Sequence, residues 1–145
     1  MQGLYHKKNE SYQCLPNNHQ NQTPNIPTYK PKVLLHGHCY QKAQPPASDG
    51  VAVGVEATVQ SLERMGYRVT VIDSGCCGMA GAFGYESEHY DLSIRVGELS
   101  LFPIIRKADP ETIIAAAGVS CRTQIKDGTG KDAWHPVQLI VNAIK

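Results

Sequence analysis

The sequence predicts an α/β fold, a small parallel sheet of three or four strands with helices flanking it. Short apolar, β-branched runs alternate along the chain with longer segments in which apolar residues recur at helical spacing. The third of these runs, residues 112–118, is apolar on both faces, which is typical of a central strand covered by helices on both sides. The order β-α-β-α-β-α implies right-handed crossovers and places the C-terminal ends of the strands at one edge.

Length and composition restrict the class of protein. A chain of 145 residues is long enough for one domain whose core needs no disulfide or metal ion to stabilise it. The 14 Lys and Arg residues nearly balance 13 Asp and Glu, and because the two signs are interspersed, we expect no nucleic-acid binding. No apolar run approaches the roughly 18 residues of a membrane span, and the N-terminus lacks the apolar core of a signal peptide. We therefore expect a cytoplasmic protein with reduced thiols.

Residues 1–31 differ in composition from the rest. They are rich in Asn, Gln and Pro and follow neither the helical nor the strand period, which predicts a flexible leader before a domain at 32–145. Cys14 lies in this leader, and we expect it to take no part in any site.

The first half of the domain contains two predicted strands and one helix. The apolar run at 33–36 is the first strand, and residues 41–50 form a loop rich in Pro and polar residues. A helix follows that ends near Gly66, with its apolar positions at Val51, Val55, Val59 and Leu62. The β-branched run at 68–72 is the second strand, and a glycine-rich loop with two adjacent cysteines comes directly after it.

The second half repeats the alternation. Residues 86–99 are predicted to be helical, with Tyr90, Ile94 and Leu101 roughly on one side and a further turn around Pro103. A turn at 109–111 leads into the third strand at 112–118. A final helix spans 135–144, with Pro136 at its first position and His135 as its N-cap.

Cysteines follow each of the three predicted strands. Cys39 lies three residues past the first strand, Cys76 and Cys77 lie just past the second, and Cys121 lies three residues past the third. Because ligands of open parallel sheets bind at the C-terminal ends of the strands, the topology predicts that these four thiols converge.

The chemistry of that edge favours a metal. A helix N-terminus after each loop would stabilise thiolate over thiol, and thiolates are the ligands of zinc and of iron–sulfur clusters. Small residues around Cys76 and Cys77 would let backbone amides approach a cluster closely, namely Gly75, Gly78, Gly81 and Gly84.

Other interpretations stay open from the residues alone. Cys39 could be a catalytic nucleophile activated by His36 or His38, and either histidine could instead be a ligand or support the loop. A disulfide between Cys76 and Cys77 would be strained. The glycine-rich loop lacks the G-x-G-x-x-G order of a dinucleotide site, so that signal is weak.

Four motifs in order, HGHCYQKA, DSGCCGMAGAFGYE, GVSCRTQI and HPVQLI, resemble the CCG domain, the cysteine-rich domain of heterodisulfide reductase-like proteins. The likeness spans about residues 32–144 and is greatest to the C-terminal iron–sulfur part of FAD-linked oxidases of the D-lactate, glycolate and 2-hydroxyglutarate dehydrogenase type. The resemblance implies a [4Fe–4S]-type cluster, or zinc in some members, held by Cys39, Cys76, Cys77 and Cys121. It also implies electron transfer with a flavoprotein partner that carries the FAD, in the cytoplasm or at the membrane through that partner.

Two departures from the family pattern bear on function. Gln124 stands where the fullest pattern has a fifth cysteine, and the sequence contains neither the flavin domain nor the ferredoxin-like module of the large oxidases. We therefore expect no catalytic residue and no turnover of a hydroxy acid by this chain alone. Three interpretations remain: an electron-transfer module, a zinc-bound structural or docking domain, or a non-functional fragment of such an oxidase.

Overall fold

The computed structural model describes residues 31–145, and its centre is a four-stranded, all-parallel sheet in the order β2-β1-β3-β4. The strands are β1 (Lys32–His36), β2 (Arg68–Val71), β3 (Ile113–Ala116) and β4 (Ala133–Trp134). The predicted α/β fold class is confirmed, and the three predicted strands agree with the observed ones to within two residues at each end. The predicted leader lies outside the described residues except for Pro31, and so does Cys14.

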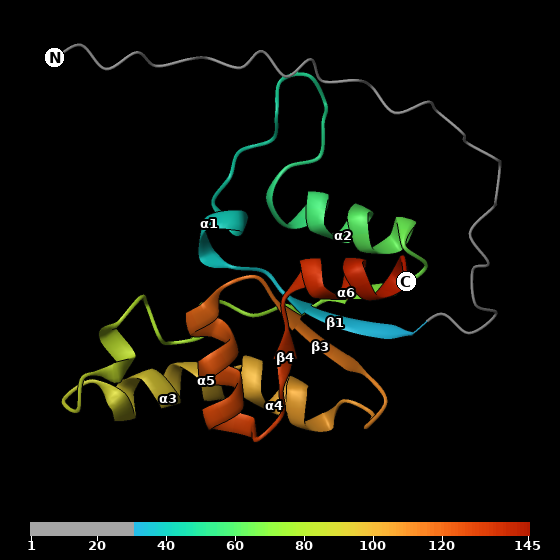
Figure 1. Ribbon diagram of the computed structural model, residues 1–145. Helices are drawn as coiled ribbons and strands as arrows, with labels where there is room; N and C mark the ends of the chain where they lie inside the picture. The colour runs from blue at the N-terminus through green and yellow to red at the C-terminus, as the bar shows by residue number, and fades with distance from the viewer. Residues whose placement is uncertain (1–30) are drawn as a thin grey trace, which may run out of the picture.

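Helices cover both faces of this sheet (Figure 1). On one face lie α2 (Gly54–Arg64) and α6 (Pro136–Ala143), which contact each other. On the other face lie α4 (Leu101–Lys107) and α5 (Val119–Thr129), with α3 (Tyr90–Glu98) packed against both. Two short elements complete the fold, the helix α1 (Cys39–Lys42) after β1 and the 3-10 helix η1 (Phe83–Tyr85) before α3.

The alternation of side chains along the central strands divides the core into two halves. Ala115 of β3 and Leu35 of β1 pack with Leu62 and Leu139 beneath α2 and α6. Ile114 and Ala116 of β3 point to the opposite face and pack with a second set of buried residues there. That set consists of Ile72, Cys77, Met79, Leu101, Phe102, Ile105, Cys121 and Ile125. Two of the cysteines therefore belong to the core itself.

The predicted helical segments needed correction at their ends. Val51 precedes α2 and is 62% exposed, so it is not on the buried face of that helix. Residues 86–89 precede α3, and Leu101 begins a separate helix, α4, where only a turn around Pro103 was predicted. Proline is tolerated there because Pro103 lies in the first turn of α4, where the backbone N–H has no helical partner.

Two helices were given no bounds by the sequence patterns, although a helix N-terminus was expected after each cysteine loop. The segment around Cys121 forms α5, which ends at Gly130 in the left-handed conformation with a φ of 72°. The short helix α1 is held by its cap, because His38 accepts a hydrogen bond from the Tyr40 amide and Gln41 reaches back to the His38 amide. The same pattern begins α6, where the predicted cap by His135 and the position of Pro136 are both confirmed.

Candidate metal centre

The four described cysteines lie together at the C-terminal edge of the sheet, as the parallel topology predicted. His36 is the last residue of β1 and pairs in register with Ala116, the last residue of β3. Cys39 begins α1, Cys76 and Cys77 lie in the loop after β2, and Cys121 lies in the first turn of α5. All four cysteines are free thiols, so there is no disulfide between Cys76 and Cys77.

Cys39 and Cys76 form the outer half of this site. Their sulfur atoms lie 3.9 Å apart. Cys39 is exposed and Cys76 is half-buried, so this pair faces solvent. The backbone N–H of Gly78 donates a hydrogen bond to the Cys76 sulfur over 3.3 Å.

His36, Cys77 and Cys121 form the inner half. A ring nitrogen of His36 and the two sulfur atoms lie within 4.8 Å of one another. The three residues are 0%, 2% and 1% exposed, respectively, so the inner half has almost no access to water. His36 donates to or accepts from the Ser74 hydroxyl through Nδ1 over 3.0 Å, whereas its Nε2 is buried without a hydrogen-bond partner.

Electrostatics favour the thiolate form of Cys77. The hydrogen bond with Cys121, the interaction with the His36 ring and a backbone hydrogen bond from Met79 together lower the pKa of Cys77 to about 4 against the opposing effect of burial. The same hydrogen bond, followed by burial and the charge on Cys77, raises the pKa of Cys121. Burial and then the charge on Cys76 raise the pKa of Cys39. Several thiolates in one place repel one another, and a bound cation would relieve that repulsion.

The donor set therefore fits a thiolate-bound metal or cluster. Four thiols and a buried, unpaired imidazole nitrogen converge from separate segments, and soft thiolates favour iron–sulfur clusters and zinc. Catalysis by Cys39 as a nucleophile fits less well, since an activated cysteine has a lowered pKa and that of Cys39 is raised. His38 caps α1 through Nδ1 with its ring stacked on Tyr40 at a centroid distance of 5.6 Å, and it is not part of the group formed by His36, Cys77 and Cys121.

The glycines of the cysteine loop differ in their surroundings. Gly78 has a φ of 97°, and a Cβ there would lie 2.0 Å from the backbone oxygen of Ser93 in α3. The close approach at Gly78 is therefore to α3, while its N–H faces the Cys76 sulfur. A Cβ at Gly75 or Gly81 would meet no protein atom within 4 Å, so their proposed approach to a cluster stays a prediction.

Three residues that support the site were not recognised in the sequence. Lys42 donates through Nζ to the backbone oxygens of Ser74 and Gly75 and so ties α1 to the cysteine loop. Arg122 donates to the backbone oxygens of Ala116 and Ala117 over 3.0 and 2.8 Å, which holds the turn before Cys121. Gln124 donates through Nε2 to the backbone oxygen and hydroxyl of Ser93 over 3.1 and 2.8 Å.

The spacing of two of these residues from a cysteine could have indicated that they support the site. Lys42 follows Cys39 by three residues and Gln124 follows Cys121 by three, so each lies on the same helical face as a cysteine. In the sequence, Gln124 stands out only because it occupies the position of a fifth cysteine. Its 1% exposure shows instead a buried amide that joins α5 to α3.

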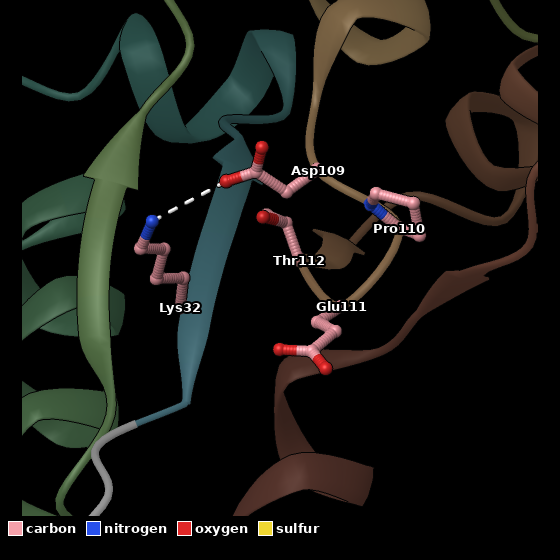
Figure 2. A pocket seen from close by; sticks show the side chains of 5 residues that line it. All are labelled: Lys32, Asp109, Pro110, Glu111 and Thr112. Atoms are coloured by element: carbon pink, nitrogen blue, oxygen red, sulfur yellow. Dashed lines mark hydrogen bonds and ion pairs between the residues drawn. The ribbon is translucent and has the colours of Figure 1, made fainter.

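The N-terminal ends of the strands, opposite the cysteines, carry a hollow lined mainly by polar residues. A hollow of about 380 Å³ lies where β1 and β3 begin, lined by Lys32, Asp109, Pro110, Glu111 and Thr112 (Figure 2). Lys32 and Asp109 form an ion pair of 3.3 Å across it, and both side chains are largely exposed. An exposed pair of this kind contributes little to stability. None of the four described cysteines lines this hollow.

Within residues 31–145, every helix is too short or too polar to cross a membrane.

Comparison with known proteins relates the chain to dehydrogenases. It is 32% identical over 109 residues to the D-2-hydroxyglutarate dehydrogenase of Escherichia coli (strain K12), which covers 75% of this chain and 10% of that protein. It is 33% identical over 110 residues to the protein of the same name from Pantoea ananatis, with 76% and 10% covered. It is also 33% identical over 91 residues to one subunit of the anaerobic glycerol-3-phosphate dehydrogenase of Escherichia coli (strain K12), with 60% and 22% covered.

The chain thus spans about a tenth of the length of the first two relatives and about a fifth of the third. No family model matches the chain. No solved structure matches it either.

Proposed function

We propose that residues 32–145 form a CCG-type cysteine-rich domain that carries an iron–sulfur cluster of the [4Fe–4S] type. In this proposal the domain transfers electrons for an FAD-linked 2-hydroxyacid dehydrogenase, either as a subunit or as a domain. One observation carries the proposal: the thiols of Cys39, Cys76, Cys77 and Cys121 gather from three strand ends at one edge of the sheet. The similarity to D-2-hydroxyglutarate dehydrogenases supports the class of partner.

The four cysteines are the proposed ligands of the cluster. A bound cluster of this type takes up and releases single electrons. Cys77 and Cys121 lie in the core and keep water from the inner side of the site. The exposed Cys39 leaves the outer side open, which suits exchange of electrons with a partner protein. The hydrogen bond from the Gly78 N–H to Cys76 would tune the reduction potential.

A role in electron transfer also explains why the relatives are named for different substrates. Similar segments of about 90 to 110 residues occur in proteins named for different substrates, a hydroxyglutarate and glycerol-3-phosphate. A segment that serves both reactions is expected to handle what they share, the electrons removed from substrate, and to leave substrate binding to other domains. The FAD would accordingly be carried by the partner, in the cytoplasm or at a membrane to which the partner is attached.

The inner half of the site also supports a second function, zinc binding in a structural or docking domain. One histidine and three cysteines are a closed tetrahedral set for structural zinc. His36, Cys77 and Cys121 already lie within 4.8 Å of one another, and one thiol of the outer pair would complete the set. Such a site would have no role in electron transfer.

Anaerobic reductive titration tests the proposed function. The chain is purified without oxygen, its visible absorption is recorded, and dithionite is added stepwise. The proposal predicts a coloured protein that takes up about one electron per cluster and bleaches in the visible range. A colourless chain with one zinc ion and no electron uptake would contradict it and favour the zinc-bound domain.

A further inference from the structure

His36 has the surroundings of a metal ligand. It is 0% exposed at the C-terminal end of β1, in a core made mostly of apolar side chains. Its Nδ1 is held by the Ser74 hydroxyl over 3.0 Å, and its Nε2 is buried without a hydrogen bond of good geometry, although the ring interacts with the Cys77 thiol. Buried polar groups are nearly always paired, because burying one without a partner forfeits its hydrogen bonds to water. The unpaired Nε2 therefore requires an explanation.

An imidazole that binds a metal needs one free ring nitrogen, with the other nitrogen held by a hydrogen bond. Histidines that bind metals almost always engage the other ring nitrogen in a hydrogen bond, which fixes the tautomer and the orientation of the ring. Ser74 provides that bond to His36, and Ser74 lies in the segment that leads to Cys76 and Cys77. Lys42 holds the same segment through the Ser74 backbone oxygen. The ring of His36 is thus positioned from two elements.

The direction of the ring is toward the thiols. A ring nitrogen of His36 lies within 4.8 Å of both the Cys77 and the Cys121 sulfur atoms. Since Nδ1 is engaged by Ser74, Nε2 is the nitrogen that is free for this group. The other histidine beside the site, His38, uses its Nδ1 to cap α1 and is not part of the group.

We infer that Nε2 of His36 is a ligand of the bound metal, together with Cys77, Cys121 and one thiol of the outer pair, so that the centre has mixed cysteine and histidine ligation and His36 takes the place of the fourth thiolate. This inference rests on the proposed function for the iron of a cluster, and the same geometry applies to zinc. Imidazole is a neutral ligand, whereas thiolate is negative. Replacing a thiolate by imidazole raises the potential of an iron–sulfur centre. His36 therefore sets this centre to accept electrons more readily than four thiolates alone would.

The buried amide of Gln124 does not compete for this role. Its Nε2 donates to both oxygen atoms of Ser93, so the side chain is engaged with α3. Among the described residues, the group that combines thiols with a further nitrogen ligand contains only His36 in addition to Cys77 and Cys121.

Isotope labelling of the wild-type chain tests the inference without any substitution. The full chain is produced with ¹⁵N-histidine or with natural histidine, its cluster is reduced anaerobically, and nitrogen hyperfine coupling is measured by pulsed electron paramagnetic resonance. The inference predicts a strong nitrogen coupling that changes from the ¹⁴N to the ¹⁵N pattern. A reduced cluster with no histidine coupling would overturn it while leaving the proposed function intact.

Substitutions then assign the signal to one histidine. His36→Ala is expected to abolish the coupling and lower metal occupancy, and added imidazole is expected to restore both. His38→Asn keeps a capping side chain and is the matched control, in which the coupling should persist. Loss of the coupling in His38→Asn and its persistence in His36→Ala would overturn the inference. If His36→Ala does not fold, the labelling result on the wild type still decides.

X-ray absorption separates this inference from the proposed function. If the chain binds zinc without sulfide, the electron-transfer proposal fails, and the zinc edge spectrum then tests His36 alone. One imidazole in the zinc shell, lost in His36→Ala, would support His36 as a ligand. A shell of sulfur only would overturn it. A chain that binds no metal after anaerobic reconstitution would overturn both.

Discussion

At the scale of single residues, Cys77 and Cys121 matter most because they join the proposed metal site to the core. Both belong to the hydrophobic cluster beneath α4 and α5, and neither is more than 2% exposed. Their hydrogen bond is the largest cause that lowers the pKa of Cys77, and it favours the thiolate that a metal would bind. The outer pair, Cys39 and Cys76, has no comparable burial.

Cys77→Ser is expected to abolish metal loading, since a serine hydroxyl at this position stays protonated and binds soft metals poorly. Bound metal per chain, measured after anaerobic purification, should fall at least about tenfold. The matched control is Cys14→Ser, which should load like the wild type. Loading that depends on Cys14 and not on Cys77 would show that the site is assigned wrongly.

Gly78→Ala is expected to destabilise the fold, because its Cβ would lie 2.0 Å from the Ser93 backbone oxygen at a φ of 97°. The cost should be about 2–4 kcal/mol in the free energy of unfolding, measured with urea. Gly75→Ala is the control in the same loop, where a Cβ meets nothing within 4 Å, and it should change stability by less than about 1 kcal/mol. Equal effects of the two substitutions would contradict this explanation.

At the scale of helices and strands, Gln124 links α5 to α3 behind the cysteine loop. Its amide donates to both oxygen atoms of Ser93, which is itself 0% exposed. A Cβ at Gly78 would also lie 3.1 Å from the Gln124 Nε2, so the loop, α3 and α5 meet at this point. The arrangement of Cys77 and Cys121 depends on these three segments keeping their positions.

Gln124→Ala is therefore expected to lower the free energy of unfolding by about 1–3 kcal/mol, because it leaves the buried Ser93 hydroxyl unpaired. Urea unfolding of the metal-free chain measures this effect. Gln60→Ala, which removes a surface hydrogen bond of 3.1 Å to Glu56 within α2, should cost less than about 0.5 kcal/mol. If Gln124→Ala lowers the free energy of unfolding no more than Gln60→Ala does, the buried amide has no structural role.

The sequence predicted some elements better than others for physical reasons. The strands were found because β1 and β3 are largely buried in the centre of the sheet and are mostly apolar. The helix α4 was missed because Pro103 suggested a turn, although proline is compatible with a first helical turn. The extent of α5 was not predicted, although a helix N-terminus was expected after its cysteine loop, because its apolar period is weak: its buried residues are Cys121, Gln124 and Ile125, and one of them is polar.

At the scale of the whole molecule, parallel topology explains why distant cysteines meet. The register of β1 with β2 and with β3 brings these strand ends to one edge, and this convergence was predictable from the order of elements. The division into an exposed pair and a buried group was not predictable, because it depends on how α5 and the loop after β2 pack on the sheet. The unpaired state of the His36 Nε2 depends on the same packing and was not predictable either.

Removal of the metal is expected to destabilise the domain, since the ligands come from three separate segments that the metal joins. Anaerobic treatment with a chelator should lower the melting temperature by roughly 10 °C or more, and reconstitution should restore it. In Cys77→Ser the chelator should have no effect. A wild-type melting temperature that does not change on removal of the metal would contradict a structural link between the site and the core.

The most direct test of the central claim is the content of iron, zinc and acid-labile sulfide per chain after anaerobic purification. The claim that four cysteines at the sheet edge hold a cluster predicts about four iron and four sulfide per chain. It also predicts that Cys77→Ser loses both and that Cys14→Ser keeps both. One zinc ion per chain without sulfide, or no metal even after reconstitution, would contradict it.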